Sequence, residues 1–299
     1  MNLHYLTGVA LGVLGGFLTQ GGQLLEKKAV NRIRQDFPNK GFMKALVKSP
    51  VWVVGFFLGL GCGTIAYMLA QNLIGPALVP GLMASGLIVL AIGSVKMNQE
   101  KLNNSEIFGI FLMVSGILFL GLSGLGINST QVKSTLADPH ALRRIAIFTL
   151  GFIALFISSR LFVIRRQNRK GLFIALGNGF LSCLSDFWIN PLLALVAIVV
   201  AGHGSVTQAV IVCFAALILI FCASVITWQN QVAFKVAQAS NIVPVAQVPI
   251  QIAPVLVYFY VFALIPTSPL ATFYLVAGSI ITIFAGFLLG RRQDIQIPK

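Results

Sequence analysis

Long apolar stretches alternate with short polar segments along almost the whole chain. Each stretch holds about 20 apolar residues, the length that a helix needs to cross the hydrocarbon region of a bilayer. The apolar positions are continuous and do not alternate with polar ones, so the pattern predicts helices and excludes the strands of a membrane barrel. The predicted spans are residues 5–25, 50–72, 76–95, 106–125, 142–163, 171–201, 206–232, 241–263 and 270–290.

The sixth run, residues 171–201, is longer than one straight span requires, and it is interpreted as either a tilted helix or a helix broken near Asn190–Pro191. Loop charge favours a single span there. With nine spans, the loops on the N-terminal side hold only three of the 21 lysines and arginines, namely Lys133, Arg143 and Arg144. Because basic loops stay in the cytoplasm, we expect an external N-terminus, a cytoplasmic C-terminus and a location in the plasma (inner) membrane.

Composition agrees with this architecture and excludes several functions. Only 9% of the residues are charged and the mean hydropathy is +0.91, whereas a soluble domain carries about 25% charged residues. The net charge of +14 is explained by basic loops beside anionic lipid, so no nucleic-acid partner is predicted. The sequence contains no phosphate-binding loop, catalytic motif or Cys/His cluster, which predicts neither an enzyme nor a cofactor or resident metal.

The chain also resembles itself at a shift of about 163 residues. Gly8 and Gly16-Phe17-Leu18-Thr19 recur as Gly171 and Gly179-Phe180-Leu181-Ser182, and Leu78-Val79-Pro80 recurs as Ile242-Val243-Pro244. Spans one to four therefore match spans six to nine, with an odd number of crossings between them. This predicts two inverted four-helix repeats, the architecture of many secondary transporters. The predicted units are residues 1–125 with a basic loop at 26–49, a connector with span five at 126–170, and residues 171–299.

Glycine ladders at four-residue spacing occur on the first two spans. Gly8, Gly12 and Gly16 form one, and Gly55, Gly59 and Gly63 form the other. Such ladders allow close helix approach in lipid, so we expect spans one and two to pack against each other.

Asp186 is the only acidic residue deep inside a predicted span, and a buried ionisable group in a membrane is a candidate for function. Ser182, Asp186 and Asn190 share one helix face at four-residue spacing. The repeat places them opposite Thr19, Gln23 and Lys27 of span one. A purely structural role for the aspartate is the alternative.

Further uncharged polar residues in the spans complete the candidate site. They donate and accept hydrogen bonds, which suits a polar solute, although contacts between helices explain them equally well. These residues are Gln20, Asn230, Gln247 and Gln251. Glu26, Lys27 and Lys28 are interpreted as the end of span one, with their side chains extending to the cytoplasmic interface.

The segment from Lys27 to Gly121 resembles a known transporter group through several short motifs. They are Glu26-Lys27-Lys28 before a basic loop, Leu46-Val47-Lys48-Ser49-Pro50-Val51-Trp52, Ala66-Tyr67, Pro76-Ala77-Leu78-Val79-Pro80, Glu100-Lys101-Leu102, and Gly109 to Gly116. The resemblance is to the drug/metabolite transporter superfamily, in its nine-span branch with NIPA-like magnesium transporters and EamA-like permeases. It implies transport by alternating access between inverted halves. The magnesium branch carries Gly-Glu where this chain has Gly59-Leu60, which disfavours magnesium as the substrate.

The leading hypothesis is a secondary transporter of a small polar metabolite, coupled to protons or a cation through Asp186. A magnesium or other divalent-cation transporter is one alternative. A membrane scaffold without transport activity is another, and the inverted repeat disfavours it because a scaffold needs no such symmetry. The expected partners are the solute, a coupling ion, membrane lipid and a second copy in a homodimer.

Overall fold

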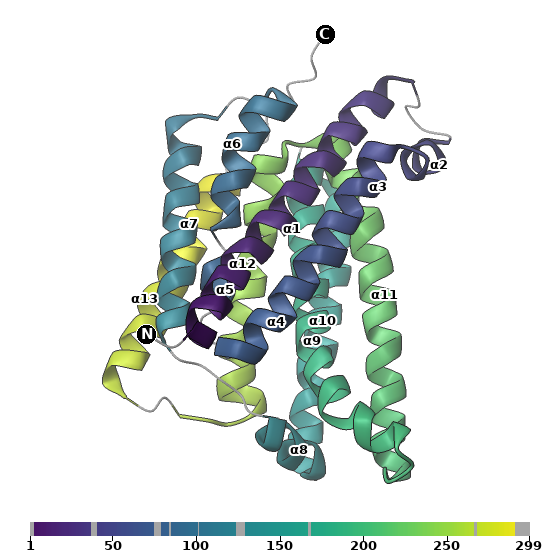
Figure 1. Ribbon diagram of the computed structural model, residues 1–299, viewed down its shortest axis with the longest axis vertical. Coiled ribbons are helices and arrows are strands. Elements are labelled where there is room, and N and C mark those ends of the chain that lie inside the picture. The colour runs from purple at the N-terminus through teal and green to yellow at the C-terminus, as the bar shows by residue number, and fades with distance from the viewer. Residues whose placement is uncertain are drawn as a thin grey trace.

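The computed structural model describes residues 3–36, 41–74, 79–83, 85–100, 102–123, 129–166, 169–265 and 268–290. Helices dominate these residues, and no strand occurs among them (Figure 1). In chain order the elements are α1 (Leu3–Asp36), α2 (Phe42–Val47), α3 (Pro50–Phe56), η1 (Phe57–Gly63), α4 (Thr64–Ile74), α5 (Val79–Met83), α6 (Gly86–Asn98), α7 (Asn104–Leu122), α8 (Ser129–Ala137), α9 (Pro139–Arg165), α10 (Lys170–Val200), α11 (Val206–Val236), α12 (Ala239–Leu256), η3 (Val257–Val261) and α13 (Pro269–Gly290).

The prediction of an all-α integral membrane protein is confirmed. Eight helices within the described part of the chain are long and apolar enough to cross a bilayer. The third predicted span, residues 76–95, corresponds to two shorter helices, α5 and α6, and its first three residues lie outside the described ones. The sixth span is one unbroken helix, α10, with Pro191 inside it, so the alternative of a helix broken at Asn190–Pro191 is wrong.

Apolar side chains cover the outside of the bundle as well as its interior. On α11, Val210, Leu217 and Ile220 are between 62% and 66% exposed. Surface of this kind is stable only in contact with lipid or another apolar surface. The bundle therefore has the exterior of a membrane-spanning domain.

Helix α1 is longer than the predicted first span, since it continues from residue 25 to Asp36 without interruption. Glu26 and Lys27 lie in this continuation and are only 9% and 5% exposed. The interpretation that both side chains extend to the membrane interface is wrong, because helix α11 packs over this part of α1 and encloses them.

The predicted packing of span one against span two is confirmed, since α1 contacts α3, η1 and α4, but not every glycine of span one takes part in that contact. On span two, Gly55 and Gly59 contact α1 at Gly22, where a Cβ atom on Gly22 would lie 2.5 Å from the Gly55 carbonyl oxygen. Gly12 and Gly16 instead contact Leu82 and Met83 on α5. Helix α1 therefore packs against span two through its middle and against α5 through its first half, so both contacts use glycine.

One close contact occurs twice, at positions shifted by 163 residues. A Cβ atom on Gly16 of α1 would overlap the carbonyl oxygen of Met83, and one on Gly179 of α10 would lie 2.5 Å from the carbonyl oxygen of Ala246 in α12. The α1 contact with the third span is thus matched by the α10 contact with the eighth.

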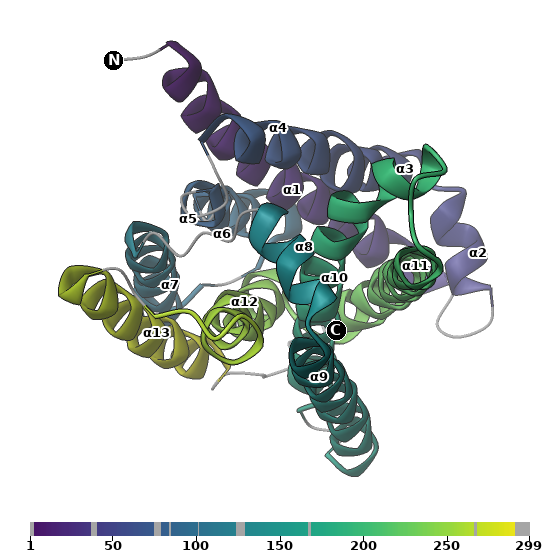
Figure 2. The ribbon, with the colours of Figure 1, turned by 90° about the horizontal axis from the view of Figure 1, so that it is seen from below.

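Helices α7 and α13 pack side by side at one flank of the bundle (Figure 2). Gly116 and Gly278 meet at their contact: a Cβ atom on Gly116 would lie 3.1 Å from the Gly278 carbonyl oxygen, and one on Gly278 would lie 2.8 Å from the Gly116 carbonyl oxygen. Gly116 of span four and Gly278 of span nine therefore contact each other reciprocally.

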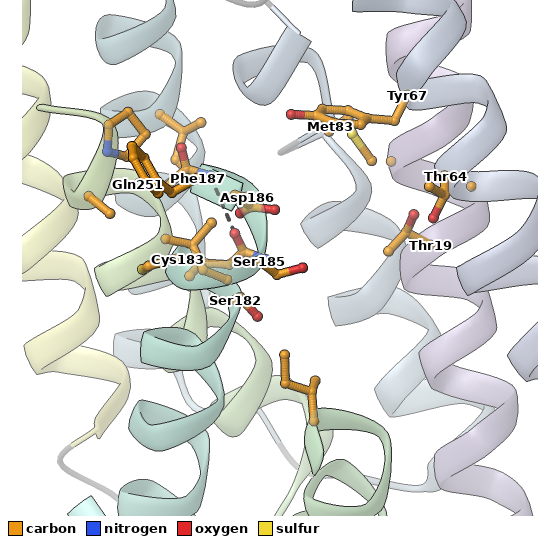
Figure 3. A pocket seen from close by; sticks show the side chains of 18 of the residues that line it. Thr19, Thr64, Tyr67, Met83, Ser182, Cys183, Ser185, Asp186, Phe187 and Gln251 are labelled. Atoms are coloured by element: carbon orange, nitrogen blue, oxygen red, sulfur yellow. Dashed lines mark hydrogen bonds between the residues drawn. The ribbon is translucent and has the colours of Figure 1, made fainter. Parts of the chain in front are cut away.

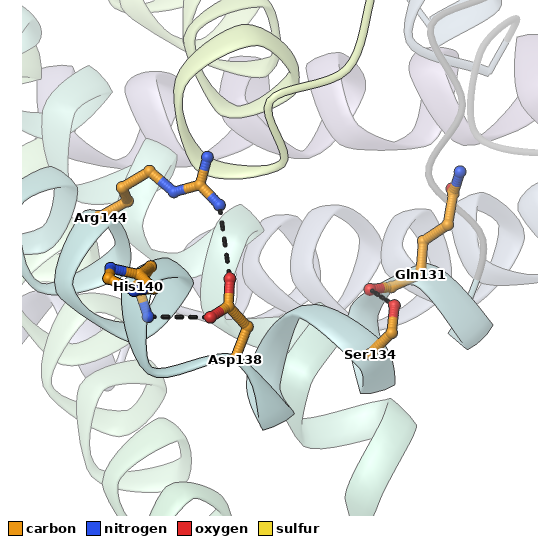
Figure 4. A network of polar contacts seen from close by, with 5 residues as sticks. All are labelled: Gln131, Ser134, Asp138, His140 and Arg144. Atoms are coloured by element: carbon orange, nitrogen blue, oxygen red, sulfur yellow. Dashed lines mark hydrogen bonds and ion pairs between the residues drawn. The ribbon is translucent and has the colours of Figure 1, made fainter.

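A polar corner joins α8 to α9 at the end of the bundle opposite α2 (Figures 1 and 4). Asp138 begins α9 by accepting a hydrogen bond from the backbone N–H of His140 at 3.0 Å, and its other oxygen lies 3.9 Å from Arg144. In α8, Ser134 donates to the carbonyl oxygen of Gln131 at 3.0 Å. The Asp138 cap begins α9 as a separate helix after α8, and both helices pack against α10.

We expect Gly22→Ala to lower the melting temperature of the protein in detergent. The added methyl group would strike the Gly55 backbone, and overpacking of this kind costs about 1–3 kcal/mol. The matched control is Gly151→Ala, because nothing lies within 4 Å of a Cβ atom at Gly151. Equal melting temperatures for the two variants would contradict this description of the contact.

The orientation in the membrane stays a prediction, and the predicted cytoplasmic C-terminus falls at residues 291–299, outside the described ones. We expect a cysteine at Lys170 to react with an impermeant maleimide only from the cytoplasmic side, and one at Lys133 only from outside, because basic loops stay cytoplasmic. Labelling of intact cells before and after permeabilisation distinguishes the two sides. The reverse pattern would invert the assigned topology.

Candidate functional site

A central cavity of about 560 Å³ lies between helices of the first and second halves of the chain. Its walls come from α1, span two and the ends of α6 and α7 on one side, and from α10, α11 and α12 with η3 on the other. In Figure 3, Ser182 and Asp186 lie on one wall, and Thr19, Thr64 and Tyr67 lie on the facing wall.

The structure brings all the predicted site residues to this one cavity. They are Thr19, Gln20 and Gln23 on α1, Ser182, Asp186 and Asn190 on α10, Asn230 on α11, and Gln247 and Gln251 on α12. Asp186 and Asn190 are exposed although they lie in the middle of α10. Because both line the cavity, a solute inside it can reach them.

Several of the cavity's amide groups are partly occupied by contacts with neighbouring side chains. Asn230 accepts a hydrogen bond at 2.7 Å from Asn178, which fixes α11 to α10. Gln251 donates to Gln247 at 3.3 Å along α12. Each amide keeps further donor or acceptor positions, so these residues both join helices and present polar groups to a solute.

All charged side chains that line the cavity among the described residues are acidic. Among the described residues, the charged members of the lining are Glu26 and Asp186, and no lysine, arginine or histidine of that part of the chain lines the cavity. This is notable in a chain of net charge +14 with only seven acidic residues. Low-dielectric walls strengthen the resulting negative potential. The cavity therefore attracts cations and repels anions.

Lys27 does not lie on the cavity-facing side of α1, where the repeat placed it together with Thr19 and Gln23. Thr19 and Gln23 line the same cavity as Ser182 and Asp186, but Lys27 is not part of the lining. Its ammonium group points instead to the end of α11, where it donates to the carbonyl oxygens of Phe234 and, at 2.7 Å, Ala237.

Several lining residues are not among those that the sequence predicted for the site. Thr64 and Tyr67 lie three residues apart on one face of α4, and Glu26 follows Gln23 by three residues on α1. The three-residue spacing is the signal that identifies both pairs. Thr227 and Ser185 also line the cavity; each neighbours a predicted site residue within one helical turn.

The end of the bundle that carries α2, which we call the basic end, is closed by contacts between the two halves. Besides Lys27, Arg34 of α1 donates to the Lys235 carbonyl oxygen at 2.8 Å. Glu100, which follows α6, accepts hydrogen bonds from the backbone N–H of Ala239 at 2.8 Å and from the backbone N–H and hydroxyl of Ser240 at 3.1 and 2.7 Å. First-half side chains thus cap the end of α11 and the start of α12.

The described residues contain no site that would bind a fully dehydrated metal ion through protein ligands alone. No group of three or more His, Cys, Asp or Glu side chains comes together there. The oxygen atoms that line the cavity belong instead to two carboxylates and to amide and hydroxyl side chains. Such a lining is suited to a polar or hydrated solute, which keeps part of its own water shell.

Membrane-spanning helices around a polar central cavity define this chain as a polytopic membrane transport protein. Residues 3–295 match the family model described as "Magnesium transporter NIPA", and the chain belongs to that family. The family is one of membrane transporters within the drug/metabolite transporter superfamily. Comparisons with curated proteins and with solved structures found no match.

The capping contacts at the basic end lead to a stability prediction. Glu100→Ala should lower the unfolding free energy by about 2 kcal/mol, because three donors at the start of α12 lose their acceptor. Glu100→Gln keeps one acceptor oxygen and should lose less. Thermal melting in detergent measures both, and an alanine variant as stable as the wild type would exclude the capping role.

Proposed function

We propose that this protein transports Mg²⁺ across the membrane by alternating access, with the central cavity as the cargo site. The observation that carries the proposal is the charge of that cavity: the described residues give it two carboxylates and no basic side chain, within a strongly basic chain. Membership in a family described as magnesium transporters supports the same cargo.

The cavity chemistry is compatible with hydrated Mg²⁺. This ion gives up its water reluctantly and is usually bound through one or two carboxylates while it keeps several waters. Asp186 supplies a carboxylate from α10, and Ser182, Gln23 and Thr19 supply further polar groups to the same cavity. The absence of Glu at position 60 argued against magnesium only while Asp186 was the single deep acid. Glu26 lines the same cavity and provides a second carboxylate.

Alternating access is supported by the duplicated packing of the two halves. The contact of Gly16 with Met83 recurs in Gly179 with Ala246, and Gly116 meets Gly278 reciprocally. Both observations are what inverted repeats related by a twofold axis would produce. Lys27 and Glu100 join the two halves at the basic end, which is the cytoplasmic end under the predicted topology.

A polar metabolite is the second candidate cargo. Two features favour it: the volume of about 560 Å³ is large for an ion, and Gln247 and Gln251 offer donors as well as acceptors. An uncharged or cationic metabolite fits the lining, whereas an anionic one would be repelled by both carboxylates.

Purified protein in liposomes that contain a Mg²⁺-sensitive dye tests the proposal. We expect Asp186→Asn to lower the rate of Mg²⁺ uptake at least about tenfold, since it removes a charge from a low-dielectric site while keeping shape and hydrogen bonding. Asp138→Asn is the matched control, because this carboxylate lies in the α8–α9 corner outside the cavity lining and its replacement still caps α9.

Uptake at the wild-type rate by Asp186→Asn would show that the cargo does not bind at Asp186. Wild-type vesicles that take up no Mg²⁺ but exchange a radiolabelled polar metabolite would favour the second candidate. The same vesicles measured with and without a pH gradient report whether protons are the coupling ion.

A further inference from the structure

Glu26 occupies the place where the cavity meets the closed basic end. It lines the cavity together with Gln20 and Gln23 of the same helix, yet its side chain is only 9% exposed. One carboxylate oxygen accepts a hydrogen bond from the amide of Gln231 on α11. The Glu26 side chain of the first half therefore lines the cavity and also contacts a helix of the second half.

Three amide oxygens on α1 and α11 lack a donor among the described residues. The side-chain oxygens of Gln20, Gln23 and Gln231 are buried and have no hydrogen-bond partner. Gln20 is 5% exposed and Gln231 is fully buried. Buried acceptors without a donor are costly. A cation beside Glu26 would offer a partner to such oxygens, whereas an anion would not.

The same carboxylate is directly connected to the contacts that close the basic end. Lys27, the next residue of α1, holds the carbonyl oxygens of Phe234 and Ala237. Gln231, which holds Glu26, lies three residues before Phe234 on α11. Both contacts therefore join the same turn of α1 to the last two turns of α11, and loss of one loosens the other.

We propose that Glu26 is a second cation-binding position, at the closed end of the cavity, that links filling of the cavity to opening of the basic end. This inference rests on the proposed cation transport. A hydrogen bond to a carboxylate is stronger than one between neutral groups. A cation that binds Glu26 competes with the Gln231 donor for the carboxylate, so α11 is released from α1 when the cavity is loaded.

The test follows opening with a single cysteine. Ala239, at the start of α12, is completely buried, and Ala239→Cys is the reporter in a background with Cys62, Cys183, Cys213 and Cys222 replaced by alanine. The rate of labelling by a bulky maleimide is measured in detergent with EDTA and with Mg²⁺. We expect Mg²⁺ to raise the rate about fivefold in the background protein, in line with the weakening of one charge-assisted bond.

Glu26→Gln imitates the bound cation by removing the charge. It should raise labelling about as much in EDTA, and Mg²⁺ should add nothing further. Glu106→Gln is the matched control, since Glu106 is also buried but caps α7 within the first half. Gln231→Met removes the donor without changing the cavity's charge, and it should also raise labelling in EDTA.

Labelling of Glu26→Gln at the background rate in EDTA would overturn the proposal, and so would an undiminished response of this variant to Mg²⁺. The two proposals fail separately. If wild-type liposomes take up no Mg²⁺, the proposed cargo is wrong, whereas the EDTA measurements on Glu26→Gln and Gln231→Met still decide whether Glu26 controls the basic end. Thermal melting of each variant confirms that it is folded.

Discussion

The ammonium group of Lys27 is buried between the two halves of the protein and donates to two carbonyl oxygens at the end of α11. The last carbonyl groups of a helix have no partner within the helix, and they are costly to bury without one. A charge in the same place is costly as well, so each group stabilises the other. This mutual dependence fixes α1 against α11 and thereby sets the closed end of the cavity. With Glu100 holding the start of α12 in the same way, the position of the whole α11–α12 corner depends on side chains from the first half.

Hydropathy and helical spacing were sufficient to predict the spans and most of the cavity. The runs that became α10 and α11 are long and apolar, and a bilayer leaves a continuous apolar chain little choice but a helix. Asp186 was found because a carboxylate inside such a run is rare, and Ser182 and Asn190 because they share its face. The amides Gln247 and Gln251 followed from the same spacing on α12. In these cases the chemistry depends only on local periodicity, which the sequence contains.

The remaining features of the site depend on which helices contact each other, and local sequence patterns do not contain that information. Glu26 and Lys27 stand beside another lysine at the end of an apolar run, which is the usual composition of a membrane interface; only the packing of α11 over them makes them internal. The glycines of span one show that a close contact exists but not its partner, so Gly16 was assigned to span two and lies against Met83 on α5. Position 60 is likewise a leucine, and the second carboxylate of the cavity comes from Glu26 on α1, a different helix.

Two of the spans that line the cavity contain a stretch of π-helix, η1 at Phe57–Gly63 and η3 at Val257–Val261. A π-helical turn holds more residues than an α-helical one and is often found at functional positions. Within span two, the η1 stretch changes the direction in which all later side chains point, by about 100° for one additional residue. Thr64 and Tyr67 come directly after η1, so their orientation toward the cavity is set by these wide turns.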